Sequence, residues 1–99
     1  MWTVDQIKNL LQTNDRAVTR GLLTIYARQT ADEQSSEQTR HHNGVGFSAF
    51  DAPFLSSLAL QLCQGRTLSV RQMEISRKRI QKYARQLAEV ANAREKEIA

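Results

Sequence analysis

Residues 70–99 decide the fold, and they read VRQMEISRKRIQKYARQLAEVANAREKEIA. The stretch contains neither glycine nor proline, the two residues that most disfavour the interior of a helix. Its apolar side chains recur at helical spacing and would share one face of a helix. These are Met73, Ile80, Tyr83, Leu87, Val90 and Ala91. The pattern predicts one straight helix of about 27 residues, which would measure about 40 Å.

A helix of that length is long for a chain of 99 residues. A domain of this size has a radius of gyration of about 13 Å, so the end of the helix should extend beyond the body of the domain. Three arrangements of this end remain open. The terminal residues fray while the rest packs on the first helix, a second copy covers it, or another protein does.

The same stretch is strongly basic. Residues 71–85 carry six lysines and arginines against Glu74, a local charge of 6 − 1 = +5, whereas residues 1–65 carry five bases and six acids, a charge of −1. A helical wheel places Arg71, Lys78 and Lys82 in a ridge opposite the apolar face. Such a ridge suits phosphate groups or an acidic protein surface, and a merely solvated basic face is the alternative.

Three further positions carry helix-start signals, in which a side-chain oxygen accepts a hydrogen bond from a free backbone N–H. Thr3 with Gln6 and Ser69 with Gln72 have the capping-box pattern, and Asp51 precedes Pro53, which the first turn of a helix tolerates. Each cap is flanked by apolar residues that could pair across it. The pairs are Trp2 with Ile7, Phe50 with Leu55, and Leu68 with Met73.

A further helix is predicted from about residue 15 to about residue 29, capped by Asn14 or Thr13, with Val18, Leu22 and Ile25 on its inner face. Gly21 inside it costs about 1 kcal/mol relative to alanine, so we expect close approach of another helix there. Gly65 should end the third helix. The short connection that follows predicts an antiparallel hairpin, and the fold class is a small all-α domain of four helices.

The segment from residue 30 to residue 49 is rich in polar residues and glycine and predicts a long loop. It is either a solvated connector or a partner-binding loop. We expect Val45, Phe47 and Phe50 to enter the core and anchor its far end. Arg40, His41 and His42 are the candidate contact residues within it.

Composition excludes several classes of protein. A single cysteine, Cys63, cannot form an intramolecular disulfide, and no stretch resembles a secretion signal or a membrane span, so we expect a cytoplasmic protein. Cys63 and the two histidines lack the spacing of a metal site, and we expect Cys63 to be buried as a small apolar residue. No motif joins a nucleophile to a base. We therefore expect no cofactor, no bound metal and no catalysis.

Several stretches resemble small proteins of phages, prophages and plasmids: QTADEQ at 29–34, NGVGFSAFDA at 43–52, the two serines at 56 and 57, GRTLS at 65–69 and RKRIQKY at 77–83. The resemblance covers about the last two thirds of the chain and includes no catalytic signature. It implies a mobile genetic element of a bacterium, where small non-enzymatic proteins act as anti-CRISPR or other anti-defence inhibitors.

The sequence thus predicts a non-enzymatic protein that binds and blocks a host defence complex by covering its surface. The alternative is a nucleic-acid-binding accessory or regulatory protein of the same element. Either function would use the protein as a monomer or a homodimer, without contact with a membrane. The expected contact residues are Arg71, Lys78, Arg79, Lys82 and Arg85, with the loop from Arg40 to Gly46 second.

Overall fold

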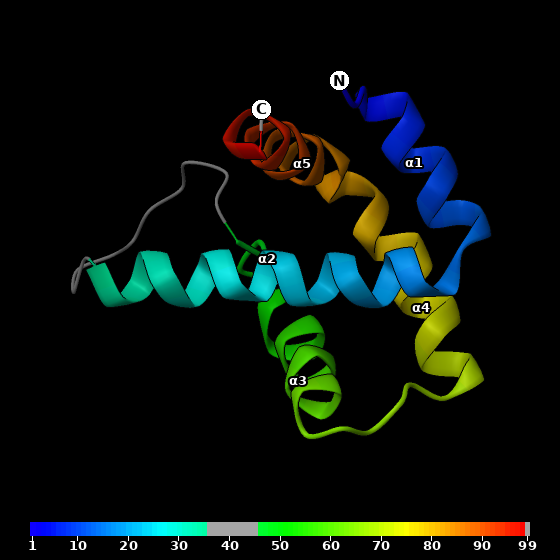
Figure 1. The fold of residues 1–99 in the computed structure, drawn as a ribbon. Helices are drawn as coiled ribbons and strands as arrows, with labels where there is room; N and C mark the ends of the chain where they lie inside the picture. The colour runs from blue at the N-terminus through cyan, green and yellow to red at the C-terminus, as the bar shows by residue number, and fades with distance from the viewer. Residues whose placement is uncertain (36–45, 99) are drawn as a thin grey trace.

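The structure, a computed structural model, describes residues 1–35 and 46–98. Within these residues the chain is helical and contains no strand, which confirms the all-α prediction (Figure 1). The elements are α1 (Val4–Thr13), α2 (Asp15–Ser35), α3 (Ala52–Cys63), α4 (Val70–Ile80), the 3₁₀ turn η1 (Gln81–Tyr83) and α5 (Ala84–Ile98). No helix in the described ranges is both long and apolar enough to cross a membrane.

Helix α2 is the element on which the others assemble. α3 and α4 both pack on it, and α1 lies over α2 and along α5 (Figure 1). The predicted packing of α3 against α4 as an antiparallel hairpin is wrong, because each of the two helices packs on α2 and few residues of α3 approach α4. Gln61 of α3 and Gln72 of α4 join them, because the Gln61 amide nitrogen donates to Gln72 Oε1 at 3.1 Å.

Most of the predicted helix starts are confirmed. Thr3 and Ser69 form complete capping boxes, and Asn14 caps α2 by accepting a hydrogen bond from the backbone N–H of Ala17. Asp51 is the exception, because its side chain makes no capping hydrogen bond. α2 also continues to Ser35, beyond the predicted end near residue 29.

The prediction of one straight C-terminal helix is wrong. The 3₁₀ turn η1 interrupts it between Ile80 and Ala84, and the chain changes direction there (Figure 1). A straight rod of about 40 Å would exceed the largest dimension of the molecule, 36 Å. The break lets α4 pack on α2 while α5 turns back along α1. The Asn92 side chain both accepts from Trp2 N at 2.7 Å and donates to Trp2 O at 3.0 Å, so α5 lies along the first helix at least as far as Asn92.

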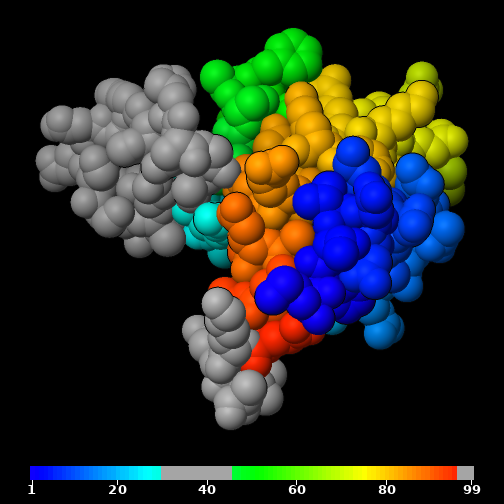
Figure 2. All heavy atoms as spheres, turned by 90° about the horizontal axis from the view of Figure 1, so that it is seen from above, coloured from blue at the N-terminus to red at the C-terminus, as the bar shows by residue number. Residues whose placement is uncertain are grey.

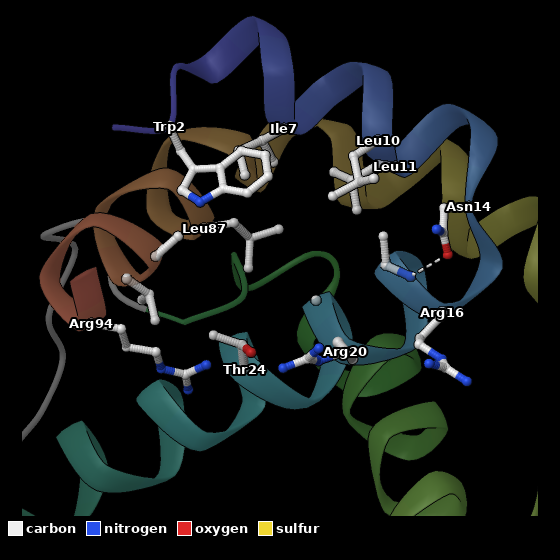
Figure 3. A pocket seen from close by; sticks show the side chains of 14 residues that line it. Trp2, Ile7, Leu10, Leu11, Asn14, Arg16, Arg20, Thr24, Leu87 and Arg94 are labelled. Atoms are coloured by element: carbon white, nitrogen blue, oxygen red, sulfur yellow. Dashed lines mark hydrogen bonds between the residues drawn. The ribbon is translucent and has the colours of Figure 1, made fainter. Parts of the chain in front are cut away.

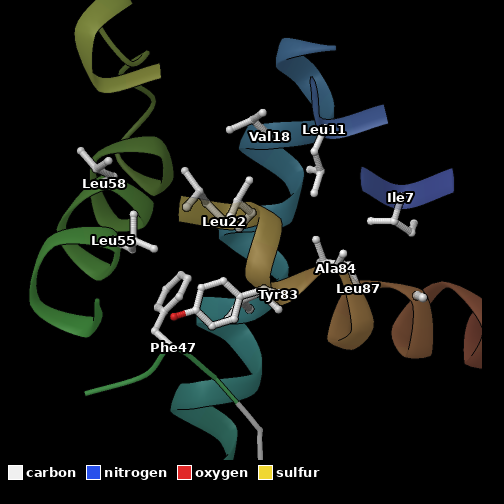
Figure 4. Close-up of a cluster of buried hydrophobic side chains, with 13 residues drawn as sticks. Ile7, Leu11, Val18, Leu22, Phe47, Leu55, Leu58, Tyr83, Ala84 and Leu87 are labelled. Atoms are coloured by element: carbon white, nitrogen blue, oxygen red, sulfur yellow. The ribbon is translucent and has the colours of Figure 1, made fainter. Parts of the chain in front are cut away.

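Gly21 provides the predicted close approach. A Cβ atom at this position would lie 3.3 Å from Leu87 Cδ1 and 3.5 Å from Ile80 Cγ1, so the bare backbone of α2 meets the helices on both sides of η1. Around it the structure buries one continuous cluster (Figure 4). Its members are Ile7, Leu11, Val18, Leu22, Ile25, Phe47, Leu55, Leu58, Ile80, Tyr83, Ala84, Leu87 and Ala88.

The far end of the predicted loop is anchored, as expected. Gln86 accepts from the backbone N–H of Gly46 and donates to its carbonyl, and Gln29 accepts from the backbone N–H of Phe47. Gly46 has a φ of +87°, and a Cβ there would lie 2.7 Å from Gln29 Cβ, so only glycine fits.

Two expectations about buried side chains are wrong, and one cannot be placed. Phe47 enters the core and packs edge-on against Tyr83, but Phe50 is 77% exposed and does not belong to the buried cluster that contains Leu55. Cys63, the last residue of α3, is exposed as well. Val45 lies outside the described residues.

Ser76 offers a test of the packing between helices. Its side chain is completely buried, and its hydroxyl has no hydrogen-bond partner in the part of the chain that the structure describes. A buried hydroxyl without a partner destabilises the fold, and alanine is the better helix former. We expect Ser76→Ala to raise the free energy of unfolding by about 1 kcal/mol, measured by urea denaturation. Ser57→Ala, on an exposed face, is the matched control, and an equal effect in both would contradict this account.

Candidate functional site: a basic concavity at the helix break

Asp51 lies at the centre of a polar cluster that holds the helix break in place. Its carboxylate is completely buried. Lys82 Nζ lies 2.7 Å from Asp51 Oδ2, and Arg79 Nη1 lies 3.4 Å from Asp51 Oδ1. The Tyr83 hydroxyl donates to Asp51 Oδ2 at 2.6 Å and accepts from the backbone N–H of Ser48 at 3.0 Å. The start of α3 is thus tied to η1 by an ionised group.

The electrostatics of this cluster keep each group in its usual protonation state. Burial raises the pKa of the Asp51 carboxyl, but the hydrogen bonds from Lys82 and Tyr83 and the ammonium charge outweigh burial and hold that pKa below its ordinary 3.8. The hydrogen bond to Asp51 raises the pKa of Lys82 above 10.5. Burial and the same carboxylate raise the pKa of Tyr83 above 10.0. None of the three is shifted towards neutrality, where a general acid or base works best.

Phe50 stands beside these cations with its ring exposed to solvent. The guanidinium of Arg79 lies 5.4 Å from the centroid of Phe50 and 5.3 Å from that of Phe54, within the range of a cation–π interaction. The Arg79 guanidinium therefore interacts with a buried carboxylate and with two aromatic rings. This contact orients Phe50 although the ring is not packed in the core.

Together these groups line a shallow hollow on one face of the molecule, which we call the basic concavity. Figure 2 shows the segments that meet there: α1 in blue, the residues just before α3 in green, and α4 with η1 in yellow to orange. It holds four cations and one carboxylate, and because Asp51 is fully buried, the exposed charges are all positive. Its lining residues are Lys8, Phe50, Asp51, Lys78, Arg79, Gln81 and Lys82.

The predicted contact residues are only partly brought together. Lys78, Arg79 and Lys82 line the basic concavity, whereas Arg71 and Arg85 are exposed but lie outside it. Arg40, His41 and His42 lie outside the described residues.

The continuous ridge of Arg71, Lys78 and Lys82 is also corrected. Lys78 and Lys82 line the same hollow but Arg71 lies outside it, and Asp51 neutralises part of the charge of Lys82 and Arg79.

Arg77 lies in the same basic stretch but has a structural role. Its guanidinium donates to the carbonyls of Leu11 and Gln12 at the end of α1 and pairs with Asp15. It satisfies carbonyl groups that a helix end leaves unpaired.

Sequence reasoning missed four members of the concavity, namely Lys8, Phe50, Asp51 and Gln81. Lys8 comes from α1, and nothing in the spacing of charges along residues 71–85 points to a base more than sixty residues away. Phe50 was expected inside because an apolar residue just before a helix cap commonly packs against the first turn. No local sequence signal indicates its exposure, because Asp51 has the residue type of a helix cap; in the structure its carboxylate instead contacts Tyr83 and Lys82, and Phe50 is exposed.

The described residues contain no group of three or more histidine, cysteine or acidic side chains able to hold a metal ion. Comparison of the chain with protein-family models, with curated proteins and with solved structures found no match.

Proposed function

We propose that this protein is a non-catalytic binding protein that docks through the basic concavity onto an acidic surface of a protein partner and covers that surface. The observation that most directly supports this proposal is the exposure of Phe50. Its aromatic side chain is 77% exposed, and it lies beside the cations that line the concavity, Lys8, Lys78, Arg79 and Lys82. An exposed aromatic side chain next to arginine is the composition that dominates protein–protein interfaces. The surrounding cations would steer an acidic partner towards it.

The chemistry of the polar cluster supports binding over catalysis. Asp51 stays ionised, and Lys82 and Tyr83 stay protonated, so the cluster offers neither a proton donor nor a proton acceptor matched to neutral pH. Its geometry instead fixes the concavity, because the same carboxylate holds Arg79 under the rings and Lys82 at the rim. Such preorganisation lowers the entropy lost on binding.

The resemblance to phage and plasmid proteins extends this proposal to an inhibitor of a host defence complex of the anti-CRISPR kind. That extension remains a prediction, as does the cytoplasmic location. It requires that the partner captured by the concavity belong to such a complex and lose activity when bound.

The test compares capture from a bacterial lysate by the native chain and by two single variants. We expect Phe50→Ala to weaken binding to the captured partner about 30-fold and Lys78→Glu about tenfold, because an anchoring ring and an interfacial charge pair are lost. Val70→Ala removes an apolar side chain that is 80% exposed, and Arg66→Glu reverses an exposed charge elsewhere, so both are matched controls. Affinities are measured by titration calorimetry with the purified partner.

Nucleic-acid binding is the outcome that would replace this proposal. It predicts a complex with random duplex or single-stranded DNA at low salt, with an affinity falling steeply as salt rises, by a slope of about 0.9 per duplex phosphate neutralised. It also predicts loss of the captured material after nuclease treatment. Capture that survives nuclease and depends on Phe50 supports a protein partner, and capture unaffected by both variants shows that the concavity is not the docking surface.

A further inference from the structure

A second concave surface lies on another side of the molecule, between α1, α2 and α5 (Figure 3). It is a groove of about 290 Å³, and none of the exposed cations of the basic concavity lines it. Apolar side chains from Trp2, α1 and α5 form most of its surface. Those that matter here are Trp2, Ile7, Leu10, Leu87, Val90 and Ala91.

The other wall of the groove is cationic. Arg20 and Thr24 project from α2 and Arg94 from α5, and in Figure 3 the guanidinium groups of Arg20 and Arg94 lie on either side of Thr24. Neither arginine forms an ion pair with any residue whose side chain the structure describes. The lining contains no carboxylate. Arg16 lines the groove as well and likewise forms no ion pair among the described residues, so three cations and a hydroxyl lie beside an apolar surface without an internal counter-charge.

This combination selects among the classes of occupant. Grooves between helices that bind small molecules are mainly apolar, with a few polar groups that fix the orientation of the ligand. A cationic ligand would be repelled by Arg20 and Arg94. A second copy that presents the same groove would bring like charges together, which disfavours a symmetric dimer through this face. An anion that carries an apolar chain is complementary to both walls, because its charge attracts the arginines and its chain packs on the apolar side chains.

We propose that this groove binds a single-chain anionic amphiphile, a carboxylate with a chain of about ten carbons. A chain of this length suits a first probe, because 290 Å³ is about ten times the volume of a water molecule in the liquid. The carboxylate accepts hydrogen bonds from Arg20, Thr24 and Arg94. The chain lies against Trp2, Leu10 and Val90 and displaces water from their exposed surface.

Trp2 reports binding directly, because it is the only tryptophan of the chain and lines the groove. Its backbone is held by the two hydrogen bonds to Asn92, so the indole remains at the groove wall, with the residue 37% exposed. Decanoate, used where it is monomeric, should shift Trp2 emission to shorter wavelength in a saturable, one-to-one titration. Decyltrimethylammonium, with the same chain and the opposite charge, and butyrate, with the same head group and a short chain, should each bind at least tenfold more weakly.

Substitutions test the contributions of the cationic wall and the apolar wall to binding separately. We expect Arg20→Gln combined with Arg94→Gln to weaken decanoate binding at least tenfold, because two hydrogen bonds to a charged group are lost. Both arginines are exposed, so circular dichroism should show an unchanged fold. Arg66→Gln combined with Arg71→Gln makes the same change in net charge outside the groove and should leave the affinity unchanged. Leu10→Asp should weaken binding about tenfold, since it places a charge on the path of the chain.

Equal affinities for decanoate and decyltrimethylammonium, or for butyrate and decanoate, would overturn the proposal. It would also be overturned if the double arginine variant bound decanoate as tightly as the native chain, or if Trp2 emission shifted only with vesicles of anionic phospholipid. One further result would replace the proposal by another. If an acidic amphipathic model helix binds and decanoate does not compete, the groove is a peptide-docking site. Since Phe50 and Lys78 do not line this groove, failure here leaves the proposed function standing, and the reverse also holds.

Discussion

Replacing Asp51 by asparagine is expected to lower the free energy of unfolding by about 3 kcal/mol, measured by urea denaturation. The substitution keeps the size of the side chain but removes the charge that Lys82, Arg79 and Tyr83 share. Breaking a buried ion pair usually lowers the free energy of unfolding by about 3–5 kcal/mol, because one charge stays buried without a partner. Here the side chains of Lys82 and Arg79 are 54% and 35% exposed and regain water, so the lower end applies.

The pH dependence of stability provides a second measurement on the same variant. The lowered pKa of Asp51 adds stability above its ordinary 3.8, and this stability is lost as the pH falls through the folded-state value. The raised pKa values of Lys82 and Tyr83 add stability below 10.5 and 10.0, which is lost as the pH rises through their folded-state values. The native chain should thus be most stable between about pH 4 and pH 10, and Asp51→Asn should flatten both limbs.

Glu74→Gln is the matched control for this experiment. Glu74 is an exposed carboxylate on α4, and its neutralisation should change the free energy of unfolding by less than about 0.5 kcal/mol. Equal losses in the two variants would mean that net charge, and not the cluster around Asp51, governs stability. An unchanged acid limb in Asp51→Asn would show that another group titrates there.

Gly21→Leu is expected to cost about 3 kcal/mol of unfolding free energy, again from urea denaturation. The new side chain must extend beyond a Cβ that would already lie 3.3 Å from Leu87 Cδ1 and 3.5 Å from Ile80 Cγ1. Ile80 is completely buried and Leu87 nearly so, which leaves the larger residue no free space. Leucine is a better helix former than glycine, so any loss comes from overpacking and not from local propensity.

Three further variants test whether the effect of Gly21→Leu comes from overpacking. Gly21→Ala should stay within about 1 kcal/mol of the native chain, because the gain in helix propensity offsets a contact that the flexible end of Leu87 can relieve. The double variant Gly21→Leu with Leu87→Ala should recover part of the lost stability, since it removes the nearest obstructing group. Ala27→Leu, at an exposed position of α2, should change little. A similar loss in Ala27→Leu would contradict overpacking.

The local parts of the fold could be predicted from the sequence because short-range chemistry determines them. Thr3, Asn14 and Ser69 cap helices through atoms at most three residues away, and Gly65 takes the positive φ expected after a helix end. Gly21 was predicted to allow close approach, since a mid-helix glycine is costly without a packing reason. In the candidate site, charge counting alone identified Lys78, Arg79 and Lys82.

By itself, then, the sequence determined the helical class, the helix starts and the basic character of residues 71–85, all of which depend on residue type and near neighbours. Only the tertiary structure decided that the C-terminal stretch breaks at Gln81–Tyr83, that Asp51 turns inward and that Phe50 is exposed. The physical reason is competition for Asp51. A free backbone N–H is a weaker partner for a carboxylate than Lys82, Arg79 and Tyr83, and those groups reach Asp51 only after α4 has packed on α2.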